Sequence, residues 1–246
     1  MSKRQRIRRY VLAATAVAVA ATAGAALASP AAATAPAAVT SDLDDDGYAD
    51  LAAGVRDATV DGSTKAGYVN VVRGGPEGLG AYGNTRISQA RPGIPGVPEQ
   101  GDRFGAAVAV ADMDHDGRDD LVAGAPGEAI GSRAKGGAAT LLLGGPNGLV
   151  GRYGEGHSVA YQQDTPRVPG VAEAGDAFGA AVTTGDYDHD GTPDVAVGSP
   201  GENGSSGGVR VLPSASVDGS CTITPARLVL ASPTSALTYG KTLSSH

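Results

Sequence analysis

Asp42-Leu43-Asp44-Asp45-Asp46-Gly47-Tyr48-Ala49-Asp50 is a nine-residue stretch whose pattern, D-x-D-x-D-G-x-x-D, returns at residues 112–120 and 186–194. Carboxylates at the first, third and fifth positions of a tight loop converge on one point, and the glycine permits the sharp turn. The ninth-position aspartate can close the shell, and the backbone carbonyl at position seven can add an oxygen. Such a set of oxygen ligands suits a hard cation such as Ca²⁺, whereas without a cation the crowded carboxylates repel one another.

Repetition in register makes a solvated acidic turn a poor explanation of the pattern, so we predict three cation sites. An EF-hand is disfavoured because its glutamate at position twelve is replaced by Ala53, Ala123 and Val197, and because the flanking sequence is not helical. The residues at position four of the second and third loops, His115 and His189, are expected to point away from the cation.

Composition favours a β-rich chain with many turns. The 246 residues include 38 glycines, 15 prolines, two phenylalanines and no tryptophan, so alanine and valine must fill the interior. A net charge of −7 disfavours a nucleic-acid partner. The one cysteine, Cys221, excludes an intramolecular disulfide; an unpaired thiol is the simpler interpretation and an intermolecular disulfide the alternative.

The first 28 residues are predicted to be a signal peptide, with a basic start, an apolar segment at 11–27 and an Ala26-Leu27-Ala28 cleavage site. We therefore expect a secreted, extracellular chain with no stable membrane span after cleavage; Sec and twin-arginine export both remain open. Residues 29–41 are predicted to be a flexible Ala/Pro-rich leader, and residues 42–246 a repeat domain.

The acidic loops recur 70 and 74 residues apart, a spacing that suits a four-stranded propeller blade. After each loop we predict an apolar strand ending at a glycine, a Gly-rich turn and a third strand, with outer strands near 85–88, 157–160 and 227–230. Residues 95–105 match 169–179, and the phenylalanines in these segments, Phe104 and Phe178, are expected to anchor packing between units. The units span about 42–103, 104–177 and 178–237, with a closing strand at 237–243.

The second unit resembles the FG-GAP repeat, because it has a Phe-Gly pair, an acidic loop and then Gly124-Ala125-Pro126. The FG-GAP repeat builds the calcium-binding β-propeller of integrin α-chains. It also occurs in secreted bacterial proteins and in a glycosylphosphatidylinositol-specific phospholipase. The resemblance is clear in the second unit, altered in the third and weaker in the first, and it implies an all-β fold of three four-stranded blades with three Ca²⁺ sites. It assigns metal-ligand roles to Asp42, Asp44, Asp46, Asp50, Asp112, Asp114, Asp116, Asp120, Asp186, Asp188, Asp190 and Asp194, with backbone oxygens from Tyr48, Arg118 and Thr192.

The number of units departs from the family, whose propellers usually have about seven blades. No Phe-Gly strand precedes Asp42, whereas Tyr239-Gly240 near the C-terminus stands in for Phe-Gly. We therefore expect a C-terminal strand to complete the first blade, within one molecule or by exchange in a homodimer. A partial propeller left by an internal deletion is the alternative.

The expected function is that of a calcium-binding adhesion or protein-interaction module with a protein or surface glycan ligand. A lectin-like propeller and a hydrolase-associated propeller are the alternatives. Glu128 and Glu202 occupy matched positions, which favours a structural role. The stretch Gly156-His157-Ser158 lacks the last glycine of a nucleophile elbow. No catalytic residue and no enzymatic activity are predicted.

Overall fold

The computed structural model describes residues 38–145, 148–149, 158–225, 228 and 237–244, all within one compact unit, Ala35–His246. The predicted signal peptide and most of the predicted leader lie outside these residues. Among the residues described, no helix has the length and apolar character needed to cross a membrane.

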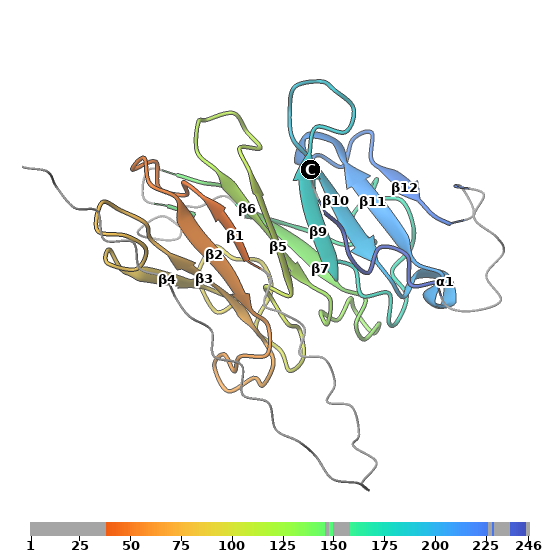
Figure 1. Ribbon diagram of the computed structural model, residues 1–246. Coiled ribbons are helices and arrows are strands. Elements are labelled where there is room, and N and C mark those ends of the chain that lie inside the picture. Colours follow the sequence, from red (N-terminus) through yellow and green to blue (C-terminus); the bar gives the residue numbers. More distant parts are fainter. Residues whose placement is uncertain (1–37, 146–147, 150–157, 226–227, 229–236, 245–246) are drawn as a thin grey trace, which may run out of the picture. The chain divides into compact units, whose positions relative to one another are not determined.

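The described chain is an all-β structure of three four-stranded antiparallel sheets, as predicted (Figure 1). Its helical segments are short: α1 (Glu202–Ser205) and the 3-10 turn Pro213–Ala215. The first sheet contains β1 (Ala38–Ser41), β2 (Asp50–Val55), β3 (Tyr68–Val72) and β4 (Asn84–Ile87). The second contains β5 (Ala107–Ala111), β6 (Asp120–Ala125), β7 (Ala138–Leu142) and β8 (Ser158–Tyr161). The third contains β9 (Ala181–Gly185), β10 (Asp194–Ser199), β11 (Gly208–Leu212) and β12 (Cys221–Ile223).

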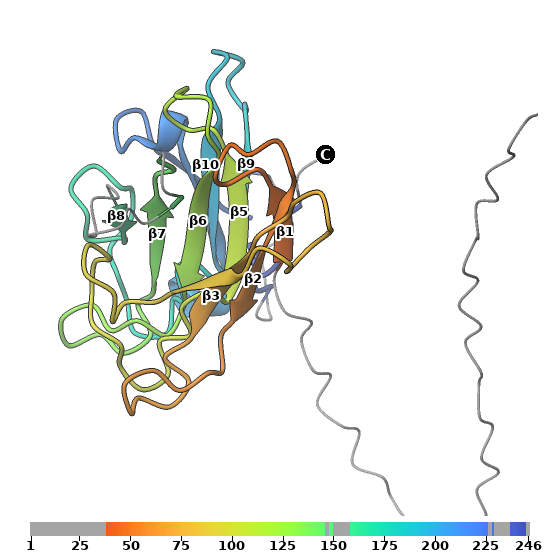
Figure 2. The same cartoon turned by 90° about the vertical axis from the view of Figure 1, so that its left-hand side faces the viewer.

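Each acidic loop joins the first and second strands of its sheet. The residue pairs that close these hairpins are equivalent: Ser41 with Asp50, Ala111 with Asp120 and Gly185 with Asp194. The first strands of the three sheets are neighbours, with β5 between β1 and β9 (Figure 1). Figure 2 views the sheets from the side of the first sheet. The Thr184 hydroxyl donates to the Val110 carbonyl across the β5–β9 contact, at 2.9 Å. The three loops therefore lie at the same end of adjacent sheets.

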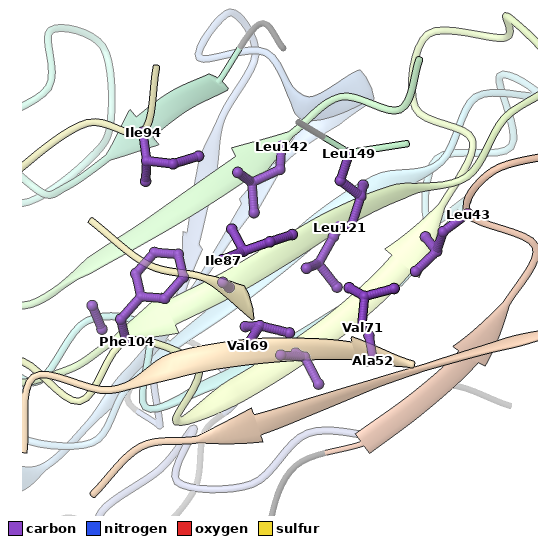
Figure 3. Packing of buried hydrophobic residues seen from close by; sticks show 13 residues of the cluster. Leu43, Ala52, Val69, Val71, Ile87, Ile94, Phe104, Leu121, Leu142 and Leu149 are labelled. Atoms are coloured by element: carbon purple, nitrogen blue, oxygen red, sulfur yellow. The ribbon is translucent and has the colours of Figure 1, made fainter. Parts of the chain in front are cut away.

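Apolar side chains fill both spaces between the sheets. Phe104 is fully buried in a cluster that combines first-sheet residues such as Val69 with second-sheet residues such as Leu121 (Figure 3). Phe178 occupies the equivalent place between the second and third sheets. Each large side chain buried in this way contributes about 1.5–3 kcal/mol. The prediction that both phenylalanines anchor packing between units is confirmed.

The turn after each aromatic residue packs directly on the glycine of the preceding unit's second strand. A Cβ on Gly54 would lie 1.9 Å from the Gly105 carbonyl oxygen, and one on Gly124 would lie 2.0 Å from that of Gly179. Only a residue without a side chain permits this approach. The Phe-Gly turn of one unit and the glycine strand of the one before it therefore form a single interlocking contact.

Two equivalent glutamates add polar contacts across the same junctions. Gln89 donates to the Glu128 carboxylate at 2.7 Å, and Gln163 donates to Glu202 at the next junction. Glu202 also has a cation beside it, because Arg210 contacts it at 2.6 Å with both side chains buried. The structural role expected of these glutamates fits both contacts.

The strand arrangement corrects the prediction about the chain ends. Residues 38–41, placed in the leader from their Ala/Pro-rich context, form β1 and complete the first sheet, with Val39 paired with Ala52. Tyr239 instead pairs with Gly207 of the third unit, as Phe178 pairs with Gly137 of the second. The prediction that residues 237–243 form the strand that closes the first blade is therefore wrong, because β1 already provides the fourth strand of that sheet.

The outer strand of the third sheet also differs from expectation. It is β12, Cys221–Ile223, which pairs with β11 from Val209 to Val211. The predicted outer strand at 227–230 lies almost wholly outside the described residues. The loop before β12 is shorter than in the other units, which moves the strand closer in sequence to its partner.

Candidate metal centres

The three acidic loops share one backbone conformation. The fourth residues, Asp45, His115 and His189, have φ values of 61°, 58° and 61°. The glycines at position six also adopt positive φ values, and a Cβ there would meet nothing within 4 Å. Glycine is therefore needed at this position for its backbone freedom.

The first-position aspartate folds the loop around its carboxylate. The two oxygens of Asp42 accept the N–H groups of Asp46 at 3.1 Å and Gly47 at 2.9 Å. Asp112 and Asp186 accept the corresponding pairs in their own loops, at 3.1–3.2 Å. These bonds turn the loop back toward the cluster of carboxylates.

The ninth-position aspartates are almost completely buried, at 1%, 0% and 1% exposure for Asp50, Asp120 and Asp194. One oxygen of each accepts the N–H of the second loop residue; for Asp120 this donor is Met113 at 2.8 Å. The other accepts an N–H just beyond the third strand, from Gly144 at 2.6 Å in the second unit. This side chain therefore ties the loop to two strands of its sheet.

The first, third and ninth aspartates of each loop form a compact carboxylate cluster. Within each cluster, one oxygen per residue lies within 4.8 Å of the others. The clusters are Asp42, Asp44 and Asp50; Asp112, Asp114 and Asp120; and Asp186, Asp188 and Asp194. Three carboxylates at one point are a donor set for a hard divalent cation.

The fifth-position aspartates and seventh residues, also predicted as ligands, belong to the turn beside each cluster. Asp46, Asp116 and Asp190 each accept the N–H of the seventh residue, at 2.9, 2.9 and 2.7 Å. The seventh residues differ in their side chains: Tyr48 is exposed, Arg118 pairs with Asp116 at 3.0 Å, and Thr192 lies 3.3 Å from His115 Nε2.

The carboxylates show the electrostatic cost of being crowded and buried. Burial is the largest cause that raises the pKa of Asp120, to about 6; backbone donors oppose it, and Asp114 and Asp112 add to it. Burial also raises the pKa of Asp44, followed by the charges of Asp50 and Asp46, although Arg73 lies 3.4 Å away. Asp44 Oδ1 is buried without a hydrogen-bond partner. A bound cation would supply that partner and offset the repulsion, so the residues fit Ca²⁺.

Contacts between loops were not predicted from the sequence. Ser41, beside Asp42, donates to Asp119, beside Asp120. His115 of the second loop contacts Thr192 of the third. No local pattern signals these contacts, because they depend on how neighbouring sheets are placed. They connect the three candidate centres into one continuous edge.

The serine of the elbow-like stretch is part of the sheet. Ser158 begins β8, and its hydroxyl donates to the Gly93 carbonyl. Gly156 and His157 lie outside the described residues.

Comparison with known proteins identifies the repeat that the sequence resembles. The FG-GAP repeat family model matches residues 104–142 and 178–212, each running from a Phe-Gly turn through an acidic loop to the third strand. The chain is also similar to phosphatidylinositol-glycan-specific phospholipase D from Rattus norvegicus, 27% identical over 164 residues, and from Bos taurus, 29% identical over 167 residues.

These matches cover 65% and 67% of this chain, but the chain spans only 18% of either relative. Their similarity is therefore to a segment of a much larger protein. The two family matches contain the second and third carboxylate clusters and both Phe-Gly turns that pack on a neighbouring glycine strand. By this sequence match and this packing, the chain contains two FG-GAP repeats, at residues 104–142 and 178–212.

Proposed function

We propose that this chain is a secreted calcium-binding β-propeller module that acts in adhesion or protein interaction. The observation that carries the proposal is the threefold recurrence of a cluster of three aspartates, each anchored by a buried ninth-position carboxylate. One divalent cation at each cluster would neutralise most of its charge. All the clustered side chains offer oxygen, which Ca²⁺ prefers.

The cation's proposed role is to hold the loops rigid rather than to perform chemistry. Each cluster lies in a hairpin loop, and its ninth residue is tied to the end of the third strand. Bound Ca²⁺ would fix these loops relative to the sheets and present a preorganised edge, which lowers the entropy cost of binding a ligand there. Secretion is supported by the predicted signal peptide and by FG-GAP repeats, which are typical of extracellular proteins.

Thermal unfolding during a Ca²⁺ titration tests the metal proposal. At a hundredfold excess over its dissociation constant, one site stabilises the folded state by about 2.7 kcal/mol. For a chain of this size, that corresponds to a rise in Tm of about 5–11 °C for each site. A Tm that does not change up to millimolar Ca²⁺, measured against a chelator control, would contradict the proposal.

The ligand class separates the proposed module from its alternatives. Ca²⁺-dependent binding on a glycan array would favour the lectin-like alternative, and binding to proteins alone would support the interaction module. The phospholipase relatives favour a hydrolase-associated propeller as the second candidate. We expect no release of phosphatidylinositol-glycan anchors by this chain; release that Ser158→Ala abolishes would establish the hydrolase instead.

A further inference from the structure

The face of the first sheet that points away from the second sheet has the apolar composition of a face that is buried between two units. Cross-strand pairs place Leu51 with Val72, Ala53 with Asn70 and Val55 with Tyr68 on this face. All six side chains are half-buried or exposed, and Val55 is 37% exposed. A mostly apolar sheet face of this kind is normally covered.

The equivalent faces of the other two sheets are covered by the preceding unit. Ala125 and Ser199, which correspond to Val55, are 1% and 0% exposed. Leu121 and Val195, which correspond to Leu51, are 1% exposed or less. Among the residues that the structure describes, the first sheet thus differs from the others because no unit packs on this face, and not because the face is less apolar.

A loop residue shows the same contrast. Leu79 and Leu149 hold the same place in the two Gly-Gly-Pro-x-Gly-Leu turns, with equivalent Gly78–Gly75 and Gly148–Gly145 hydrogen bonds. Leu149 is 4% exposed because it packs in the cluster that contains Leu43 of the preceding unit (Figure 3). Leu79 is 54% exposed. Its natural counterpart is therefore a second position of an acidic loop on another FG-GAP unit.

The third unit offers that counterpart. The second loop residue is buried in the first two units, at 1% for Leu43 and 5% for Met113, whereas Tyr187 is 45% exposed. On the same side of the third sheet, Ile223 is half-buried where its equivalents Ile87 and Tyr161 are buried. Tyr239 is likewise half-buried, unlike the two phenylalanines.

We propose that two copies of this chain associate head to tail, with the first sheet of one copy packed on the third sheet of the other. Leu79 of one copy would pack beside Tyr187 of its partner, as Leu149 packs near Leu43 within the chain. A twofold axis would generate the same contact twice and close six sheets into a ring, within the range of about four to eight blades of closed propellers. This inference does not depend on the proposed cation binding.

Light scattering on the purified chain tests the assembly. The full chain of 246 residues has a mass of 24.2 kDa, and the proposal predicts a particle of twice the mass of the chain that is purified, with or without residues 1–28. Leu79→Asp and Tyr187→Asp should each give monomers with an unchanged circular dichroism spectrum, since both side chains are exposed in the single chain. Val97→Asp is the matched control. Val97 is 63% exposed, and its equivalent Val171, in the segment that leads into the third unit, is 61% exposed although neighbouring sheets pack together there. Packing between sheets therefore does not cover this position, and the dimer should persist.

Mixing the two variants distinguishes head-to-tail packing from two first sheets facing each other. A Leu79→Asp chain retains Tyr187, and a Tyr187→Asp chain retains Leu79, so the mixture should regain one intact junction and form a dimer. A wild-type chain that stays monomeric, or a Tyr187→Asp chain that remains a dimer by itself, would overturn the proposal.

Cys221 provides a second readout within the native chain. It pairs with Val211 in the third sheet, and Val211 pairs with Ala196, so all three residues lie on the face assigned to the partner. Its thiol should react with a maleimide severalfold faster in monomeric Leu79→Asp than in the wild-type dimer. Equal rates in the two proteins would contradict burial of this face by a second copy.

Discussion

Replacing Asp120 with asparagine separates its structural role from its proposed role as a cation ligand. The two side chains have almost the same shape, but asparagine has no charge and only one acceptor oxygen. In the wild type, the Asp120 carboxylate accepts two backbone N–H groups, from Met113 and Gly144. In Asp120→Asn, the amide group must face one of these donors.

The expected loss has two parts. Hydrogen bonds to charged groups contribute about 1.5–3 kcal/mol each, so losing one of the two costs about 2 kcal/mol. Burial raises the pKa of Asp120, which shows that the charged form is held at a cost, and removing the charge recovers part of the loss. Without a cation we therefore expect a net loss of about 1–2 kcal/mol. At a hundredfold Ca²⁺ excess, loss of the site removes a further 2.7 kcal/mol, approximately.

Urea unfolding in chelator and in Ca²⁺ measures both parts. The matched control is Asp102→Asn, because Asp102 is an equally buried aspartate that accepts the Glu99 N–H and belongs to none of the three clusters. Its loss of stability should be the same in both buffers. The Asp120→Asn loss should instead be larger in Ca²⁺ by more than 1 kcal/mol, approximately. Equal losses for Asp120→Asn in the two buffers would refute cation binding at the second loop.

Three further changes test the junctions between units. Burial raises the pKa of Glu128 to about 7, so the folded chain binds a proton more tightly than the unfolded chain and the free energy of unfolding falls as pH rises from 4.5 to about 7. With solvent screening allowed for, Glu128→Gln should reduce the change in the free energy of unfolding over this pH range by about 1–2 kcal/mol, as measured by urea unfolding. A variant whose stability depends on pH as steeply as that of the wild type would contradict the raised pKa. Arg210→Thr leaves the Glu202 carboxylate buried without its cation and should cost about 3–5 kcal/mol at neutral pH; the added change Glu202→Gln should recover part of that loss. Gly124→Ala places a Cβ against the Gly179 carbonyl and should lower stability by about 3 kcal/mol or more in thermal unfolding, so a Tm close to wild type would contradict the interlocking contact.

The acidic loops were the most predictable part of the fold because their chemistry is local. The spacing of Asp112, Asp114 and Asp120 within nine residues fixes a turn, and the apolar residues that follow fix a strand. The same is true of Phe104, since a large aromatic side chain before a glycine in an Ala-rich chain has few other places to be buried. Repetition then extended each local inference to the other units.

The features that were predicted wrongly or not predicted depend on which distant segments pair in the folded chain. Residues 38–41 have no Phe-Gly marker, and only their register against β2 shows that they complete the first sheet. Tyr239-Gly240 carries the marker, but the sequence does not say which sheet it contacts. The contact between His115 and Thr192 spans two units and has no local pattern. The contrast between Leu79 and Leu149 likewise becomes visible only when their exposures are compared.

Counting bound Ca²⁺ tests the central claim most directly. Equilibrium dialysis of the purified chain against Ca²⁺, followed by elemental analysis of metal and protein, gives the number of ions per chain. Three clusters predict three ions for the wild type and two for Asp120→Asn, with Asp102→Asn retaining all three. A wild-type chain that binds no Ca²⁺ at millimolar concentration, or an Asp120→Asn chain that binds as many ions as the wild type, would contradict the account.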